Sequence, residues 1–240
     1  MERVAIVTGG TRGIGEAICT RLKESGKTVI ATYAGNDAAA NDFQSTYNIE
    51  TKKFDVGSFE QSQKALSEIY EAHGRIDILV NNAGITRDRT LHKMTPQQWD
   101  DVIRTNLSSC FNLCRSAIEN MRKNKFGRIV NIGSINGQAG QYGQVNYAAA
   151  KSGIHGFTKA LAQETAALGI TVNAVAPGYV DTDMVRAVPP EVLEKIIARI
   201  PVGRLGRASD IARVVDFLVA DDADFITGST MSVNGGQHMY

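Results

Sequence analysis

Residues 4–15 read Val4-Ala5-Ile6-Val7-Thr8-Gly9-Gly10-Thr11-Arg12-Gly13-Ile14-Gly15, an apolar run that leads directly into closely spaced glycines. A helical pattern follows, so this stretch predicts a strand, a glycine turn and the start of a helix. Glycine permits a tight turn and a close approach of the backbone, and the N–H groups at a helix start attract negative charge. The stretch therefore predicts a binding site for the pyrophosphate of a dinucleotide. Its spacing, Gly-x-x-x-Gly-x-Gly, differs from the Gly-x-Gly-x-x-Gly fingerprint, and a flexible turn without a ligand is the alternative interpretation.

Apolar, strand-like runs alternate with amphipathic helical patterns along the rest of the chain. Strands are predicted near residues 3–8, 27–33, 50–55, 76–80, 127–132, 170–175 and 229–233, and helices near 13–25, 37–47, 58–73, 96–122, 146–168, 191–198 and 208–219. Strands separated by helices predict a parallel sheet. The expected fold class is α/β, a doubly wound parallel sheet with helices on both faces. No linker or charge block divides the chain, so we expect a single domain over residues 1–240.

Composition argues against several classes of protein. With 240 residues, of which 43% are hydrophobic, the chain can bury one sizeable core. Its net charge of +1 comes from scattered lysines and arginines, so no basic stripe for nucleic acid is expected. Cys19, Cys110 and Cys114 fall in helical patterns and are predicted to be small core residues rather than disulfide partners. Two of the four histidines, His92 and His155, show no metal-ligand spacing with Cys, Asp or Glu, and no metal is implied.

The beginning of the chain and its hydropathy bear on location. The first strand is predicted to start by residue 3 or 4, which leaves no room for a signal peptide. No uninterrupted apolar stretch is long enough to span a bilayer. We therefore expect a cytoplasmic protein without a membrane segment.

The sequence Asn146-Tyr147-Ala148-Ala149-Ala150-Lys151 places a phenol and an ammonium one helical turn apart. An isolated tyrosine has a pKa of about 10, and a fixed neighbouring cation favours the phenolate. The spacing predicts that Lys151 lowers the pKa of Tyr147 and that the pair transfers a proton. A tyrosine packed beside a solvated lysine is the alternative interpretation.

Two further motifs follow predicted strands directly. Asn81-Asn82-Ala83-Gly84 comes after the apolar run 76–80, and Ile132-Gly133-Ser134 comes after Arg128-Ile129-Val130. In open parallel sheets ligands bind outside the carboxyl ends of the strands, so these motifs should share one rim with the glycine turn. Ser134 precedes Tyr147 by enough residues for a loop to bring the two hydroxyls together. By itself, Ser134 is more often a turn residue or a helix cap.

Together these motifs resemble the short-chain dehydrogenase/reductase family from Val4 to Gly236. The resemblance implies a Rossmann fold and a catalytic tetrad of Asn106, Ser134, Tyr147 and Lys151. In this tetrad Asn106 holds a water that resupplies the proton. From the residue pattern alone, an asparagine within a helical stretch would more often cap, kink or face water.

The resemblance also implies a nicotinamide dinucleotide cofactor. No acid ends the predicted strand 27–33, where an NAD enzyme binds the ribose 2′-OH, whereas Arg12 is placed to meet a 2′-phosphate. We expect NADPH, and dual specificity stays open because no arginine follows that strand. Asp55 resembles an adenine-edge contact, although a strand-ending acid at a turn is the alternative. The implied cofactor-binding residues are Gly9, Thr11, Arg12, Gly13, Ile14, Gly15, Asp55, Val56, Asn82, Ala83, Gly84, Tyr147, Lys151, Pro177, Gly178, Val180 and Thr182.

Three glutamines, Gln138, Gln141 and Gln144, lie between the two reactive hydroxyls in sequence. Amide side chains can bind a carbonyl or thioester oxygen without adding charge. Residues 134–147, 82–88 and 234–239 resemble family members that reduce 3-ketoacyl thioesters of coenzyme A, which implies acetoacetyl-CoA as substrate and a ketone-reducing enzyme. The implied substrate contacts are Ser134, Gln141, Tyr142, Gln144, Tyr147 and Tyr179. Loop polarity without a ligand is the alternative.

Other interpretations remain open. A thioester on acyl carrier protein is possible, although some relatives with that substrate place arginine where Lys125 and Leu168 stand here. A non-catalytic dinucleotide-sensing protein and an NAD-dependent alcohol dehydrogenase are further alternatives.

Two expectations concern larger pieces of the molecule. The stretch 178–206 is rich in turn breakers and is predicted to cover the substrate, with an ordinary surface excursion as the alternative. The helices predicted near 96–122 and 146–168 carry apolar and small residues on more than one side, which suits packing between subunits. The family resemblance implies a homotetramer.

Overall fold

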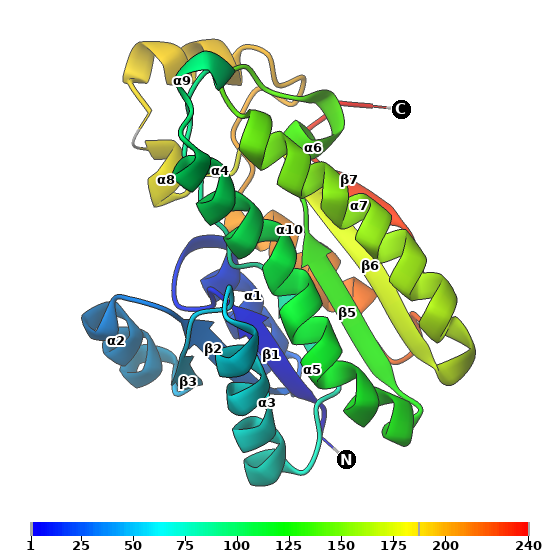
Figure 1. Cartoon of the computed structure of the whole chain (residues 1–240). Coiled ribbons are helices and arrows are strands. Elements are labelled where there is room, and N and C mark those ends of the chain that lie inside the picture. The colour runs from blue at the N-terminus through cyan, green and yellow to red at the C-terminus, as the bar shows by residue number, and fades with distance from the viewer. Residues whose placement is uncertain (1, 187, 240) are drawn as a thin grey trace.

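A computed structural model describes residues 2–186 and 188–239. Within them one parallel sheet has the strand order β3-β2-β1-β4-β5-β6-β7. The chain winds outward from β1 to β3, returns beside β1, and winds outward again to β7 (Figure 1). This is the doubly wound Rossmann arrangement, and all seven expected strands are confirmed. Their bounds are β1 Val4–Thr8, β2 Thr28–Tyr33, β3 Glu50–Lys53, β4 Ile78–Asn81, β5 Gly127–Ile132, β6 Ile170–Pro177 and β7 Thr230–Val233.

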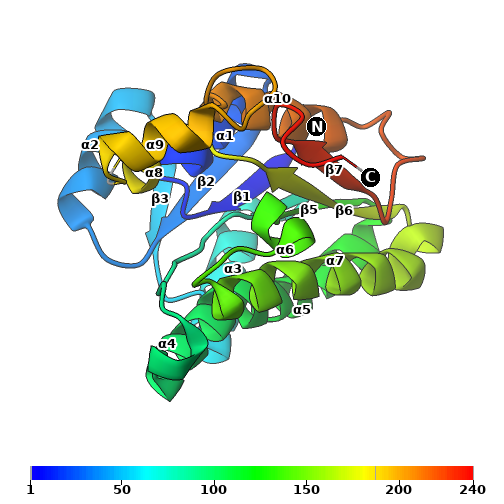
Figure 2. The same ribbon diagram turned by 90° about the horizontal axis from the view of Figure 1, so that it is seen from above.

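Helices cover both faces of the sheet, as expected. Figure 2 shows α1, α2 and α10 on one face and α3, α5 and α7 on the other. Alternate residues of β1 explain this, because Ala5 and Val7 pack against the first set while Val4 and Ile6 pack against the second. The bounds of the helices are α1 Gly13–Glu24, α2 Asp37–Tyr47, α3 Phe59–His73, α4 Pro96–Ile103, α5 Ser109–Asn124, α6 Ile135–Ala139, α7 Val145–Thr165, α8 Asp183–Arg186, α9 Pro190–Ile197 and α10 Ala208–Leu218.

The structure differs from the expected single helix over 96–122. A π-helical turn, Arg104–Ser108, separates α4 from α5, and it contains Asn106. The Asn106 side chain donates to the carbonyls of Val102 (2.9 Å) and Ile85 (2.9 Å), so it holds the widened turn against the loop that follows β4. Periodicity did not predict this turn, because its five residues are fewer than the window in which periodicity can be read.

Several short helical elements were also not predicted from the sequence. These are α6, α8 and the 3₁₀ turns Leu91–Lys93 and Ala166–Leu168, the last of which ends the helix expected to reach residue 168. Elements of three to five residues are shorter than the window in which periodicity can be read. For α6 the local signal was the cap, because Ser134 accepts from the N–H of Asn136 (3.1 Å).

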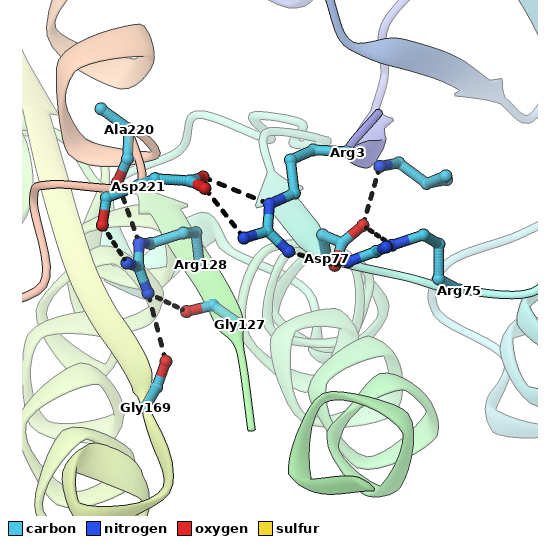
Figure 3. A network of polar contacts seen from close by, with 9 residues as sticks. Arg3, Arg75, Asp77, Gly127, Arg128, Gly169, Ala220 and Asp221 are labelled. Carbon is cyan, nitrogen blue, oxygen red and sulfur yellow. Dashed lines mark hydrogen bonds and ion pairs between the residues drawn. The ribbon is translucent and has the colours of Figure 1, made fainter. Parts of the chain in front are cut away.

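A polar network holds the end of the sheet where the strands begin (Figure 3). The carboxylate of Asp77 is buried and accepts hydrogen bonds from Arg3 (3.3 Å), Arg75 (2.6 Å) and the N–H of Val4 (2.9 Å). Arg128 is also buried, and it donates to the carbonyls of Ala220, Asp221, Gly127 and Gly169. These contacts tie β1, β4 and β5 to the segment that follows α10. They lie opposite the rim on which the expected functional residues gather.

The three cysteines are free, buried thiols in the core, which confirms their prediction as core residues. Among the described residues no helix combines the length and the hydropathy needed to cross a membrane.

Candidate active site

The glycine turn between β1 and α1 forms a backbone cradle. Gly9 (φ 61°) and Gly13 (φ 56°) adopt left-handed conformations that favour glycine, and a Cβ at Gly15 would overlap the Gly9 carbonyl oxygen. Arg12 occupies the N-cap position of α1 without a side-chain cap, so no side chain from this position covers the first N–H groups. Such a turn fits an anionic pyrophosphate.

Asn82 braces this cradle from the neighbouring strand. Its Nδ2 donates to the carbonyls of Thr8 (2.8 Å) and Gly9 (3.2 Å), while the N–H groups of Asn82 and Ala83 both donate to Thr8 Oγ1 (2.9 Å each). The two strand ends are therefore held together as the shared rim predicts. The geometry gives the Asn82 amide a role in shaping the turn, and its expected contact with a ribose stays a prediction.

The expected adenine-side residue Asp55 is engaged by protein groups. Its Oδ1 accepts from the N–H of Gly57 (2.8 Å), and its Oδ2 accepts from Arg104 (2.7 Å) in the π-helical turn. Asp55 therefore links the end of β3 to the segment that carries Asn106. This arrangement matches the alternative interpretation of a turn-starting acid and leaves an adenine contact as a prediction.

An acid does stand near the end of β2, four residues beyond Tyr33. Asp37 opens α2 and pairs with Lys53 at the end of β3 (2.8 Å). Hydrogen bonding to Lys53 lowers the pKa of Asp37, and the same contact raises the pKa of Lys53. The sequence pattern did not predict this pair. Because of this ion pair, the charge of Asp37 beside the rim is balanced by Lys53.

The structure brings Ser134, Tyr147 and Lys151 together. Ser134 lies at the start of α6, and Tyr147 and Lys151 lie on α7. The Ser134 side chain lies close enough to the Tyr147 hydroxyl to lower the pKa of that phenol. The buried Lys151 Nζ donates to the Ile132 carbonyl (2.7 Å) at the end of β5 and lies 5.6 Å from the centre of the Tyr147 ring.

The expected effect of Lys151 on Tyr147 is not what the structure shows. Burial raises the pKa of Tyr147 to about 12, against a smaller lowering by the Ser134 hydrogen bond and a further rise from the charge of Asp88. Burial lowers the pKa of Lys151 to about 8. The prediction of a lowered Tyr147 pKa was wrong for this structure, because it counted the neighbouring charge and left out the loss of solvent around both groups.

Asn106 is buried beside the same group of residues. Its Oδ1 has no hydrogen-bond partner among the described residues. A Cβ at Gly84 would lie 2.5 Å from this oxygen and 3.7 Å from Lys151 Nζ, so Gly84 lets the two polar groups approach one space. The four residues of the expected tetrad therefore converge. Asn106 comes from the π-helical turn before α5, and the other three come from the start of α6 and from α7.

The expected substrate contacts are placed unequally. Tyr142 is 87% exposed, and Gln141 is also exposed. Gln144 is held at both ends of its amide, since Nε2 donates to Asp88 (2.8 Å) and Oε1 accepts from Asn136 (2.9 Å). Tyr179 follows β6 and is partly buried, which raises the pKa of its phenol. It also lines a cavity of about 420 Å³ bordered by residues from 200 to 214 and from 233 to 235.

The nicotinamide-side loop lies near the glycine turn. Val180 pairs with Gly206 as an isolated bridge, and a Cβ at Gly13 would be 3.6 Å from Thr182 Cγ2. The Gly178 N–H donates to the carbonyl of Val233 (3.0 Å), which fixes where this loop leaves the sheet. Residues 178–182 thus stand beside the cradle formed by the glycine turn.

Asp88 and Asn136 were missed by the sequence analysis. Asp88 raises the pKa of both Tyr147 and Tyr179 through its charge, so it lies near both phenols. The sequence Ser134-Ile135-Asn136 did contain a signal for Asn136. A serine side chain often accepts a hydrogen bond from the N–H two residues later, which would have placed Asn136 beside Ser134. No local pattern indicated that Asp88 reaches this place.

Comparisons with known proteins agree with this geometry. A family model described as enoyl-(acyl carrier protein) reductase matches residues 9–238. The chain is 59% identical to an acetoacetyl-CoA reductase of Rhizobium meliloti (strain 1021) over 99% of both chains, and 56% identical to one of Paracoccus denitrificans, again over 99% of both. It is 47% identical to a 3-oxoacyl-(acyl-carrier-protein) reductase of Haemophilus influenzae, over 99% of this chain and 98% of the relative.

Proposed function

The chain belongs to the short-chain dehydrogenase/reductase family, and from that premise we propose that it reduces the 3-keto group of acetoacetyl-CoA with NADPH. It is an oxidoreductase that acts on a ketone. One observation carries the proposal most directly: Ser134 lies close to the Tyr147 phenol at the rim, and Lys151 is buried nearby. The names of the relatives supply the substrate, because acetoacetyl-CoA reductases match over nearly the whole chain at 46–59% identity.

The residues divide the chemistry among themselves. A bound nicotinamide dinucleotide supplies the hydride for the ketone carbon. Ser134 Oγ and Tyr147 Oη hydrogen-bond the ketone oxygen as negative charge develops, and Tyr147 Oη gives it the proton. Lys151 would bind the ribose hydroxyls next to the nicotinamide. Asn106 Oδ1, a buried acceptor, holds the water that resupplies the proton.

The phosphates and the adenosine side of the cofactor would be held by the glycine turn together with Asn82, Ala83 and Gly84. The carboxamide would be held by Val180 and Thr182. NADPH is proposed over NADH because Arg12 is exposed at the start of α1 and makes no ion pair within the described residues. Its guanidinium remains able to bind a 2′-phosphate. The acid nearest to β2, Asp37, is paired with Lys53, which supports the same preference.

Residues 178–206 are proposed to cover the substrate, and residue 187 within them lies outside the described residues. Helix α9 buries none of its residues, although Val192, Leu193, Ile196 and Ile197 give it an apolar side. In Figure 1 α8 and α9 stand at the end of the sheet where the strands finish. An apolar helix that is packed loosely over the site suits a cover that closes on a substrate.

A substrate panel tests the proposed function. We expect the highest kcat/KM with acetoacetyl-CoA and NADPH, and lower values with longer 3-ketoacyl-CoAs, with carrier-protein thioesters and with NADH. A higher value for the carrier-protein thioester would transfer the proposal to that substrate. If the chain bound NADPH and oxidised it with no ketone of the panel, the dinucleotide-sensing alternative would replace an active reductase.

A homotetramer is proposed as the assembly. Phe111 on α5 and Phe217 on α10 are each 53% exposed, and Phe225 before β7 is 99% exposed. Large apolar side chains on several faces suit contacts with more than one further copy. Light scattering on the purified protein should give a mass of four chains, and a stable monomer would contradict the proposal.

A further inference from the structure

The end of β2 lies between two positively charged residues. On one side β1 leads into the glycine turn, whose Gly10 N–H donates to the Thr32 carbonyl (3.0 Å), and Arg12 follows two residues later at the start of α1. On the other side Tyr33, the last residue of β2, is paired in register with Lys53 at the end of β3 (Figure 1). In sheets of this kind the adenosine ribose of a dinucleotide binds at the carboxyl end of the second strand. Arg12 and Lys53 therefore flank the place expected for the ribose 2′ position.

Lys53 is held by an ion pair that a stronger anion can replace. Within the described part of the chain, Lys53 Nζ pairs with Asp37 Oδ2 at the start of α2 (2.8 Å). Both side chains are about half exposed, at 50% and 59%. An exposed ion pair is weak, because water screens its charges and two flexible side chains have to be held in one geometry. A more highly charged group can therefore take Lys53 from Asp37.

The neighbouring lysine does not share this place. Lys52 and Lys53 are successive residues of β3, so their side chains point to opposite faces of the sheet. Lys52 pairs with Glu68 on α3, and Figure 2 shows α3 on the face opposite to α2. Of the two lysines, Lys53 is the one directed toward α2 and the end of β2.

The charges at this place suit a phosphate. A phosphate monoester carries a charge of roughly −1.5 to −2 at neutral pH, and its oxygens accept charge-assisted hydrogen bonds. Arg12 supplies one positive charge, and Lys53 supplies a second once the phosphate has displaced Asp37. With NADH no phosphate competes for Lys53, so its pair with Asp37 stays closed. No arginine follows β2 in the sequence, and Lys53 provides from β3 the cation that the loop after β2 lacks.

We propose that Lys53 determines the preference for NADPH by binding the 2′-phosphate together with Arg12, and that Asp37 competes with this phosphate for Lys53. The proposal rests on the proposed function for its cofactor. Lys53 belongs to β3 and Arg12 to the start of α1, so the two cations contact the phosphate from opposite sides of β2. The partners of the ion pair then have opposite effects, because Lys53 favours binding of the phosphate and Asp37 opposes it.

Equilibrium binding to the purified protein, without acyl substrate, tests the proposal. Isothermal titration calorimetry gives the dissociation constants of NADP⁺ and NAD⁺. Lys53→Gln should raise the constant for NADP⁺ about tenfold, the loss expected for one hydrogen bond between charged groups, and should change the constant for NAD⁺ much less. Asp37→Asn should lower the constant for NADP⁺ about twofold to fivefold, the strength of an exposed ion pair, because Lys53 is then free for the phosphate.

Further measurements separate recognition of the phosphate from effects on structure. Lys53→Arg keeps the positive charge and should retain most of the affinity for NADP⁺. Lys52→Gln is the matched control, because it removes the neighbouring lysine on the opposite face of β3, and it should leave both constants unchanged. Titration with 2′-AMP, which carries the phosphate without the nicotinamide, should rank the variants in the same order as NADP⁺.

Results of two kinds would overturn the proposal. If Lys53→Gln binds NADP⁺ as tightly as the wild type, or loses NAD⁺ equally, Lys53 does not recognise the 2′-phosphate. If Asp37→Asn weakens the binding of NADP⁺ as Lys53→Gln does, the ion pair supports the structure of the site and does not compete with the phosphate. A wild type that binds NADP⁺ no more tightly than NAD⁺ would refute the proposed cofactor preference as well. Inactivity with acetoacetyl-CoA would refute the proposed substrate alone, because the binding measurements contain no acyl substrate.

Discussion

Burial sets the protonation of the two residues at the centre of the site. It raises the pKa of Tyr147 to about 12 and lowers the pKa of Lys151 to about 8. At neutral pH Tyr147 therefore holds its proton and Lys151 is mainly a cation. A protonated phenol beside a cation is prepared to give a proton, which is the need of ketone reduction.

This protonation predicts how activity depends on pH. The Lys151 cation is present below about pH 8 and is lost as pH rises through that value. The kcat/KM for NADPH, which reports on the free enzyme, should decline above about pH 8 because Lys151 then loses its charge toward the cofactor. Profiles from pH 6 to 10 check this, with Lys151→Arg as a control whose charge does not titrate. If kcat/KM for NADPH stayed constant up to pH 10 in the wild type, the assignment of Lys151 as the titrating cation would be contradicted.

Lys151 should also weaken the fold that contains it. Its pKa is lowered on folding from 10.5 to about 8, so the unfolded state binds more protons between these values and stability rises with pH across that window. Below it the full penalty remains, on the order of 3 kcal/mol, against about 1 kcal/mol from the hydrogen bond to Ile132. Lys151→Met should therefore raise the free energy of unfolding at pH 7 by about 1–2 kcal/mol while abolishing turnover. Urea titrations check this, and a less stable variant would contradict it.

Arg12 tests the cofactor preference. Arg12→Ala should raise the KM for NADPH about 10-fold to 100-fold, because only NADPH carries the phosphate that a charged hydrogen bond would recognise. The KM for NADH should change much less. Steady-state kinetics with both cofactors measure the difference, and Arg12→Lys should retain part of the preference. Equal losses for the two cofactors would assign Arg12 to the shared pyrophosphate or to folding.

At the scale of the element, the π-helical turn gives Asn106 its place. The turn points Asn106 Oδ1 toward Gly84 and Lys151. The ion pair between Asp55 and Arg104 ties the same turn to the end of β3. A Cβ at Gly84 would approach Oδ1 to 2.5 Å, closer than atoms in contact tolerate. The tetrad therefore depends on a glycine that has no chemical group of its own.

Gly84→Ala tests this dependence. The new methyl group should push Asn106 Oδ1 aside, lowering kcat about 10-fold to 100-fold and the free energy of unfolding by about 1–3 kcal/mol. Gly156→Ala on α7 is the matched control, because a Cβ there meets no atom within 4 Å. Kinetics and thermal melts of both variants check the prediction. Wild-type kcat in Gly84→Ala would show that the Asn106 oxygen has room to spare.

Elements differ in how well the sequence predicts them. The strands and the long helices follow from alternation, glycine turns and apolar periodicity, which are local properties. The π-helical turn and α6 did not, because each has only five residues, fewer than the window in which periodicity can be read. The substrate side of the site was the hardest part. Gln144 carries an amide of the kind that binds ligands, which is what the sequence suggested. Its partners Asp88 and Asn136 are 56 and 8 residues away along the chain, and only the fold brings them to it.

For the whole molecule, polar contacts are divided between the two ends of the sheet. At the end where strands begin, Asp77 and Arg128 are bound by protein groups on several sides (Figure 3). At the other end, Asn106 Oδ1 and the first turn of α1 keep polar groups available for a ligand. The parallel arrangement made this rim predictable, since it brings the carboxyl ends of all strands together. Protonation was less predictable, because it depends on solvent excluded by the assembled core.

The most direct test compares NADPH oxidation by the wild type and by Tyr147→Phe, with acetoacetyl-CoA as substrate. The variant removes the phenolic proton and keeps the ring that fills the site. The wild type should consume NADPH and form 3-hydroxybutyryl-CoA in equal amounts, and the variant should bind NADPH nearly as well but lose about 10²–10⁴ in kcat, the contribution of general acid catalysis. Turnover close to the wild type in purified Tyr147→Phe would contradict the account.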